Sequence, residues 1–291
     1  MKQLSNLTKA MFCLVAVLLV ITVVLGIATV VKDGNKDKDN NQTSGTLLSP
    51  SPSGDGAQDA TATPTTTATP TPTLTPTPTP SGHKIALDPG QQKNAMTADE
   101  PVGPGSSTMV DKMSYGATST TTGKREYEWS LLFTSKLKEE LEARGYQVIM
   151  TREENDVEIS NADRAKFVNE SGAEIYVSIQ ADAASNVEAK GIYAQIPSKK
   201  NSFIGTMYEQ CKNLASCMQS ALIKETGAKD RGLSENDKVT TLNWSKVPVT
   251  VLQLGFMSNK EEDKNLWSED YQKKMIKAIC DGIDAYFESV E

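Results

Sequence analysis

The sequence predicts an α/β protein in which residues 83–291 form a single three-layer domain, with a mostly parallel central sheet flanked by helices. Short apolar runs alternate along this part of the chain with longer segments whose apolar residues recur at helical spacing. This alternation is typical of parallel sheets, because each parallel strand needs a crossover to the next. The 209 residues suit one domain, and its functional sites are expected at the carboxyl ends of the strands.

The composition excludes two classes of function. The chain has one histidine, His83, so a metal site with two histidine ligands cannot be built within it. Thirty Lys and Arg residues stand against 37 Asp and Glu, and the formal net charge is −7. This balance leaves no basic surplus to neutralise phosphates, so we expect no nucleic-acid partner.

Residues 10–31 predict a transmembrane anchor. These twenty-two residues carry no charge, and at about 1.5 Å per residue they can cross a bilayer core of roughly 30 Å. The apolar core of a signal peptide has only about 7–15 residues, which favours an uncleaved anchor. Lys2 and Lys9 precede the span without an acidic residue, so we expect residues 1–9 in the cytoplasm and the rest of this single-pass cell-membrane protein on the cell-wall side. Cleavage near Ala28 would instead release a secreted protein.

Residues 32–82 predict a disordered, Thr/Pro-rich linker. They hold eight of the 13 prolines, and residues 61–80 are eleven Thr, six Pro, two Ala and one Leu. Such a tract has too little apolar surface to offset chain entropy. Alternating Thr-Pro favours extended polyproline II, which would hold the next domain away from the membrane. A merely tolerated spacer and O-glycosylation of the threonines are open alternatives.

Four elements are expected in the first half of the domain. They are strands over 84–87 and 146–151 and helices over 126–144 and about 162–170. In the first helix, Phe133, Leu137 and Leu141 form one apolar stripe, and Gly145 ends it. The second helix begins at the capping-box pattern Ser160-Asn161-Ala162-Asp163.

The second half predicts three more strands and two helices. They are strands over 174–179, 191–196 and 249–254 and helices over 203–226 and 271–287. The longer helix repeats Met207, Leu214 and Met218 at helical spacing and ends at Gly227. The long stretch 91–123 is rich in Gly, Ser and Thr and is expected to lie over the carboxyl edge of the sheet.

The cysteines predict neither a disulfide nor a metal site. Cys211 and Cys217 lie six positions apart on one expected helix, so they face different sides of it, and Cys280 lies on the last helix. None of the spacings fits a CxxC or zinc-finger pattern, so packing in the core is the expected role.

The expected strand ends carry several segments in a fixed order. They are Ile85-Ala86-Leu87-Asp88-Pro89-Gly90, Glu126 at a helix start, residues 173–183, and residues 249–259 with Gly255-Phe256-Met257-Ser258-Asn259. Gly145-Tyr146-Gln147-Val148 with Thr151-Arg152, Arg164-Ala165 before Asn169, and the insert 100–105 add to the set. The collinear set resembles the zinc-dependent N-acetylmuramoyl-L-alanine amidase family (amidase type 3) over essentially all of residues 83–291. The resemblance implies an amidase or zinc-exopeptidase-like fold.

In that family the resemblance implies a zinc ion held by His, Glu and His, with a second glutamate as general base. Gln91 and Gln180 stand at the two histidine positions, and Gln253 stands at the general-base position. Glu126 matches the ligand glutamate, and Asp182 replaces an asparagine that is common in its loop. Independently of the resemblance, helical spacing places Glu126 on the same inward stripe as the three apolar residues of its helix.

These replacements predict that the metal and its chemistry are lost. A neutral amide oxygen is a poor zinc ligand, so we expect no zinc and no other cofactor. An amide cannot take a proton from zinc-bound water, and loss of a general base costs about 10²–10⁴-fold in rate. One hypothesis is that the three amides hydrogen-bond the buried Glu126 carboxylate in place of the cation. Random decay of an unused site is the alternative.

Three functions follow from the resemblance and these changes. The leading one is a membrane-anchored, extracytoplasmic, catalytically inactive amidase homologue that binds peptidoglycan or muramyl peptides, or that binds and regulates an active amidase or another envelope protein. The second is an active peptidoglycan amidase that cleaves the lactyl–L-alanine amide with an atypical metal at Glu126, Asp88 or Asp182. Asp88 is expected to be structural, because Asp before Pro-Gly commonly satisfies turn donors. The third is a purely structural envelope protein.

Overall fold

A six-stranded sheet in the order β4-β1-β5-β8-β6-β7 forms the middle layer of the computed structural model, which describes residues 82–291. Strands β4 (Gln147–Met150), β1 (Lys84–Pro89), β5 (Ile175–Asp182) and β8 (Val249–Phe256) run parallel to one another. Beyond them lie β6 (Ile192–Ile196), antiparallel to β8, and β7 (Asp230–Glu235), parallel to β6. The predicted mostly parallel sheet is therefore confirmed.

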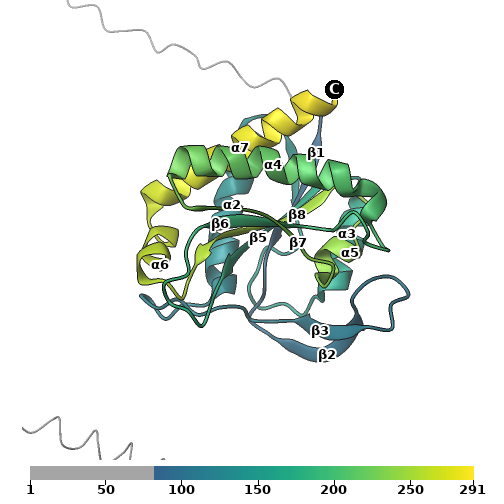
Figure 1. Cartoon of the computed structure of the whole chain (residues 1–291), viewed down its shortest axis with the longest axis horizontal. Coiled ribbons are helices and arrows are strands. Elements are labelled where there is room, and N and C mark those ends of the chain that lie inside the picture. The colour runs from purple at the N-terminus through teal and green to yellow at the C-terminus, as the bar shows by residue number, and fades with distance from the viewer. Residues whose placement is uncertain (1–81) are drawn as a thin grey trace, which may run out of the picture. The chain divides into compact units, whose positions relative to one another are not determined.

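Helices cover both faces of this sheet. Helices α2 (Glu126–Ala143), α4 (Tyr208–Thr226) and α7 (Glu269–Val290) pack on one face, and α3 (Asn161–Ser171) and α5 (Thr240–Asn243) pack on the other. Successive strand residues point to opposite faces, so Ile85 and Leu87 join the first core cluster while Ala86 joins the second. Figure 1 shows α4 and α7 side by side over the sheet. The three-layer prediction is confirmed.

Helices α2, α3 and α7 begin and end within three residues of their predicted bounds. In α2 the predicted stripe of Phe133, Leu137 and Leu141 is fully buried. The Oγ atom of Ser160 accepts the N–H of Asp163 at 3.1 Å and caps α3. Cys211 and Cys280 are buried in the core as expected.

Several elements differ from the prediction. The stretch 91–123 contains a hairpin, β2 (Met96–Pro101) with β3 (Met109–Met113), on the side of the sheet away from α4 and α7 (Figure 1). The helix predicted over 203–226 begins only at Tyr208, after a 3₁₀ turn (Gly205–Met207). Strand β7, α5 and α6 (Lys260–Leu266) were not predicted. Because β2 and β7 are polar and short, they show no alternation of apolar residues.

His83 joins the two ends of the domain. Its ring stacks on Phe287 of α7 at 3.9 Å between centroids, and its nitrogens contact Glu174 and Glu291 at 2.9 and 3.2 Å.

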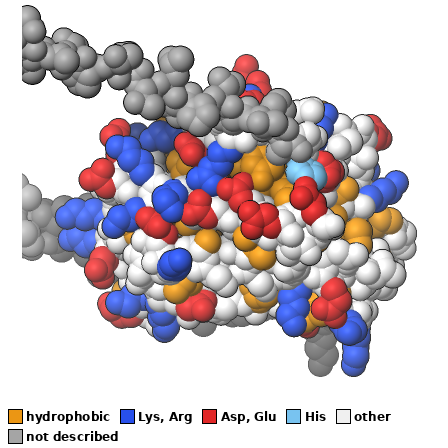
Figure 2. Space-filling model, turned by 90° about the horizontal axis from the view of Figure 1, so that it is seen from above, with side chains coloured by type: hydrophobic (Ala, Val, Ile, Leu, Met, Phe, Trp, Pro, Cys, Tyr) orange, Lys and Arg blue, Asp and Glu red, His pale blue; other side chains and the backbone are white. Residues whose placement is uncertain are grey.

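The face over α4 and α7 carries acidic and basic side chains interspersed (Figure 2).

The predictions for residues 1–81, including the anchor over 10–31 and nearly all of the linker, lie outside the described residues. Within residues 82–291, no helix combines the length and apolar character that crossing a bilayer requires.

Candidate functional site at the carboxyl edge of the sheet

Three strand ends and one helix start bring the four predicted site positions together. Gln91 follows β1, Gln180 lies near the end of β5, and Gln253 lies on β8 as the register partner of Gln180. Glu126 is the first residue of α2, and its carboxylate reaches both Gln91 and the backbone beside Gln180. The edge of the sheet therefore gathers residues that are up to 162 positions apart in the sequence.

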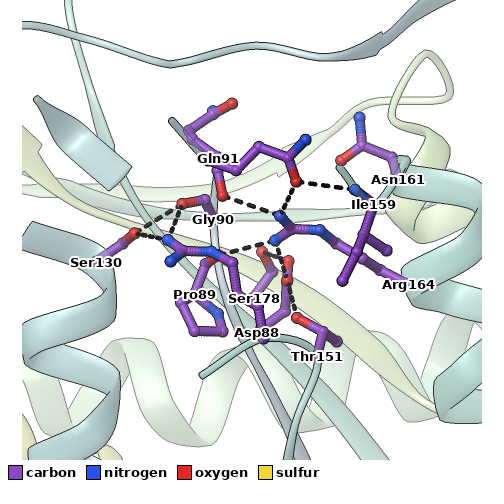
Figure 3. A network of polar contacts seen from close by, with 12 residues as sticks. Asp88, Pro89, Gly90, Gln91, Ser130, Thr151, Ile159, Asn161, Arg164 and Ser178 are labelled. Carbon is purple, nitrogen blue, oxygen red and sulfur yellow. Dashed lines mark hydrogen bonds and ion pairs between the residues drawn. The ribbon is translucent and has the colours of Figure 1, made fainter. Parts of the chain in front are cut away.

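A buried ion pair lies beneath this edge. Arg164 of α3 contacts Asp88 at 2.8 Å, and both side chains are almost fully buried. The carboxylate also accepts hydrogen bonds from Thr151 at 2.5 Å and Ser178 at 2.7 Å (Figure 3). Burial opposes its charge, yet Arg164 and the two hydroxyl groups hold the pKa of Asp88 below its ordinary value. Asp88 has a structural role as predicted, but its partners are side chains of α3, β5 and the residue after β4 and not the expected donors of the turn.

Two arginines hold the turn that ends in Gln91. Arg164 donates to the carbonyls of Pro89 and Gln91 at 2.9 and 3.0 Å, and Arg152 donates to those of Pro89 and Gly90 at 2.9 and 3.1 Å (Figure 3). Gln91 has a φ of +63°, and no other non-glycine residue in the described part of the chain has a positive φ. This conformation is strained for glutamine, and the surrounding hydrogen bonds maintain it.

The sequence alone did not identify this role for the two arginines. Arg152 and Arg164 were part of the family resemblance, and Arg152 follows β4 at the carboxyl edge. Arg152 follows a predicted strand and Arg164 lies in the first turn of a predicted helix. These positions are the signal in the sequence that could have indicated that the two arginines hold the turn before Gln91.

Glu126 is held by backbone donors. Its side chain is 3% exposed, and its two oxygens accept the N–H groups of Ala117 at 2.8 Å and Ala181 at 3.2 Å. Burial is the main influence and raises the pKa of Glu126 from 4.5 to about 7, although these N–H groups and the Gln91 amide favour the charged form. Asp182 raises that pKa further.

The other two glutamines bond to each other. The Nε2 group of Gln253 donates to Oε1 of Gln180 at 2.9 Å, and Nε2 of Gln180 lies 3.4 Å from the hydroxyl of Ser178. The hypothesis that all three amides hydrogen-bond Glu126 is therefore wrong for Gln180 and Gln253, and only Gln91 fits it. The reason is register, because β5 and β8 place the two glutamines directly opposite each other.

The loop after β3 covers the carboxylate. A Cβ atom on Gly116 would lie 2.3 Å from Oε2 of Glu126, and the residue has a φ of +75°. Farther along, one carboxylate oxygen of buried Asp263 accepts hydrogen bonds from Ser119 at 2.8 Å and from the N–H of Thr121 at 2.7 Å. This part of the stretch 91–123 lies at the carboxyl edge, as predicted.

The groups at these positions do not suit zinc. Zinc sites in proteins use imidazole nitrogen, thiolate sulfur or carboxylate oxygen, and here two of the three family ligand positions offer neutral amides. The amide oxygen of Gln180 already accepts the Gln253 amide, and both oxygens of Glu126 accept N–H groups. Within residues 82–291, no group of three or more His, Cys, Asp or Glu side chains is arranged to hold a metal ion.

The raised pKa of Glu126 predicts a pH-dependent stability. An acid whose folded-state pKa is raised contributes stability that is fully present below pH 4.5 and is lost as the pH rises through 7. Between pH 5 and pH 8, the free energy of unfolding of the wild type should therefore fall by up to about 3 kcal/mol relative to Glu126→Gln. Urea unfolding at four pH values measures this difference. Glu128→Gln controls for the removal of one charge from the same helix, and a constant difference between wild type and Glu126→Gln would contradict the prediction.

Comparison with known proteins agrees with the fold and shows the family. A family model described as N-acetylmuramoyl-L-alanine amidase matches residues 85–285. The uncharacterized protein YqiI of Bacillus subtilis is 30% identical over 155 residues, which cover 53% of this chain and 69% of that protein. The probable cell wall amidase LytH of Staphylococcus epidermidis is 29% identical over 178 residues, which cover 60% of this chain but only 54% of that protein.

Solved structures show the same architecture. An N-acetylmuramoyl-L-alanine amidase from Clostridium difficile superposes with a TM-score of 0.58 at 27% identity, covering 71% of this chain and 97% of that one. The CwlD amidase of Clostridioides difficile, solved in complex with the GerS lipoprotein, has a TM-score of 0.58 at 25% identity and covers 72% of this chain and 100% of that one.

Proposed function

Because the chain belongs to the N-acetylmuramoyl-L-alanine amidase family, we propose that it binds muramyl peptides of peptidoglycan at the amidase site without hydrolysing them. In this proposal, residues 10–31 anchor it in the cell membrane and the Thr/Pro-rich linker extends the domain toward the wall. In this proposal the ligand lies at the carboxyl edge of the sheet, where Gln91, Gln180 and Gln253 stand at the family's histidine and general-base positions.

The amide pair of Gln180 and Gln253 is the single observation that carries this proposal. Their hydrogen bond of 2.9 Å joins one family ligand position to the family general-base position. An amide has no basic group that could accept a proton near neutral pH, so neither residue can act as general base. The frame around the pair is complete nonetheless, including the Asp88–Arg164 ion pair and the buried Glu126.

An atypical metal site is the less favoured function. Asp88, one candidate ligand for it, is fully engaged by Arg164, Thr151 and Ser178. Asp182, the other candidate, accepts the hydroxyl of Tyr193. Neither carboxylate is therefore available beside Glu126 without the loss of these hydrogen bonds.

A protein partner is a further part of the proposal. The structure of CwlD with GerS is an example of an amidase of this fold in complex with a lipoprotein. An inactive homologue that binds an active amidase or another envelope protein would use the same fold for regulation. Co-purification of an envelope protein with the full-length chain, in the absence of muramyl peptides, would distinguish regulation from ligand binding.

The test measures binding and hydrolysis of one ligand together. The full-length chain, kept in detergent because residues 10–31 are apolar, is titrated with a MurNAc-tripeptide by calorimetry in the presence of zinc. We expect saturable binding and recovery of the intact ligand by mass spectrometry. The double variant Gln180→Ala/Gln253→Ala should bind more weakly, whereas Gln147→Ala, at the exposed opposite end of the sheet, should bind as the wild type does. Release of free tripeptide at the rate of an active amidase would overturn the proposal.

A further inference from the structure

Arg231 is a cation without an acidic partner at the site's edge of the sheet. Among residues 82–291, no carboxylate oxygen lies within 4.0 Å of its guanidinium, which distinguishes it from Arg144 and Arg164. Its Nη1 atom makes one long hydrogen bond, of 3.4 Å, to the carbonyl of Lys190. The guanidinium instead lies over the rings of Phe256 and Tyr193, 5.1 and 5.8 Å from their centroids. An exposed guanidinium stacked in this way keeps its N–H groups for another acceptor.

A β-bulge in β7 sets the direction of the Arg231 side chain. The pairing of β6 with β7 shifts register between Ile192 and Ala194, and Gly232 in the bulge has a φ of +70°. Asp230 fixes the bulge, because its Oδ1 atom accepts the N–H of Gly232 at 2.8 Å and the amide of Gln219 at 2.7 Å. Bulges are frequent beside binding sites because they redirect a side chain.

The rings under Arg231 connect it to the amide pair. Tyr193 lies directly opposite Gln253 in the antiparallel pairing of β6 with β8, and its hydroxyl donates to Asp182 at the end of β5. Residues paired across strands share one face of the sheet. Gln180, Gln253 and Tyr193 therefore form one row across three neighbouring strands, and Arg231 of β7 lies over the ring of Tyr193 at the end of that row. Lys190, which Arg231 contacts, also lines a hollow of about 500 Å³ at this edge.

We propose that Arg231 binds the free α-carboxylate of the second residue in the peptide stem of a muramyl peptide. This assignment rests on the proposed function and names the part of the ligand that is recognised. Two strand spacings separate Arg231 from Gln253, or about 10 Å at roughly 4.8 Å each. An extended peptide advances about 3.5 Å per residue, so the α-carboxylate of the second stem residue comes within reach of the long Arg231 side chain when the lactyl amide lies at the glutamine pair. A guanidinium binds a carboxylate through two parallel hydrogen bonds, which a lysine cannot reproduce.

Two other cations near the site are matched controls. Arg125 lies over the ring of Tyr115 at 4.6 Å, but its Nη1 group already donates to Thr118. Lys190 is the neighbour of Arg231 and carries the same charge without the stacking. Arg125→Met and Lys190→Met each remove one positive charge near the site, so they separate a specific contact from general attraction.

The test uses the full-length chain in detergent and two MurNAc-tripeptides. The ligands differ only at the second stem residue, which is D-glutamate with a free α-carboxylate or D-isoglutamine with an amide in its place. We expect the wild type to bind the acid form about tenfold more tightly or better. Arg231→Met should lower the affinity for the acid to that for the amide and leave the amide affinity unchanged, and Arg231→Lys should lie between. Both control variants should keep the preference for the acid.

The amide ligand distinguishes the possible failures. Equal affinity of the wild type for the two tripeptides would overturn the assignment alone, because the chain would still bind muramyl peptides. Equal losses for both ligands in Arg231→Met would show a structural role and would also overturn it. If Arg125→Met lost the preference for the acid while Arg231→Met kept it, Arg125 would bind the carboxylate and the assignment to Arg231 would be overturned. Failure of both tripeptides to bind would overturn the proposed function, and this assignment with it.

Discussion

Replacing Arg164 with methionine is expected to lower the free energy of unfolding by about 3–5 kcal/mol. The substitution leaves the Asp88 carboxylate buried without its counter-charge, and both side chains are almost completely inaccessible to solvent. It also removes the donor to the carbonyls of Pro89 and Gln91, so the turn that presents position 91 should loosen. Urea unfolding near pH 7 measures the loss.

Arg144→Met is the matched control for this loss. Arg144 contacts Glu140, Asp281 and Asp284, but the pairs lie at the surface and Arg144 is 24% exposed. Exposed ion pairs contribute about 0–1 kcal/mol, so this variant should lose far less. The double variant Asp88→Asn/Arg164→Met should regain part of the loss, because no buried charge is then left unpaired. Equal losses for Arg164→Met and Arg144→Met would contradict the role of the buried pair.

The triple variant Gln91→His/Gln180→His/Gln253→Glu is expected to bind one zinc ion per chain where the wild type binds none. It restores two imidazole ligands beside the carboxylate of Glu126, which is the donor set that zinc prefers. The left-handed backbone at position 91 also suits the change, because histidine is enriched over most residues at positive φ. The Asp88 network and the Arg152 contacts that hold this turn need no rearrangement.

Zinc stoichiometry after dialysis, measured by mass spectrometry, tests the gain. Gln147→His/Gln210→His adds the same number of histidines at exposed positions and controls for weak surface binding. Gln253→Glu alone should gain no zinc, because both histidine positions remain amides. If the triple variant stays free of zinc while it folds normally, the frame of the site is not that of an active amidase.

Local patterns in the sequence predicted the four longest helices and most of the sheet. The stripe in α2 predicted both its buried face and the inward position of Glu126, because one helix relates all of these residues. Gly145 and Gly227 ended their helices as expected. The apolar stripe and the helix ends depend on residues that are close together in the sequence, so they can be predicted from the sequence alone.

Contacts set by register could not be predicted in the same way. The bond between Gln180 and Gln253 depends on how β5 aligns with β8, and 73 positions separate the two residues. The backbone donors to Glu126 come from Ala117, in the loop after β3, and from Ala181, near the end of β5, and no local pattern in the sequence relates them to Glu126. Strand β7 lies at the edge of the sheet and includes Asp, Arg and Gly, so no apolar alternation marks it. No local pattern in the sequence therefore marks Arg231 as a candidate binding residue.

The zinc content of the purified full-length chain tests the central claim most directly. The chain is equilibrated with zinc, dialysed, and analysed by inductively coupled plasma mass spectrometry beside Glu126→Gln. We predict far less than one zinc per chain for both proteins, because amides occupy positions 91 and 180. One zinc per wild-type chain that Glu126→Gln loses would contradict the account, because the family site would then still hold its metal.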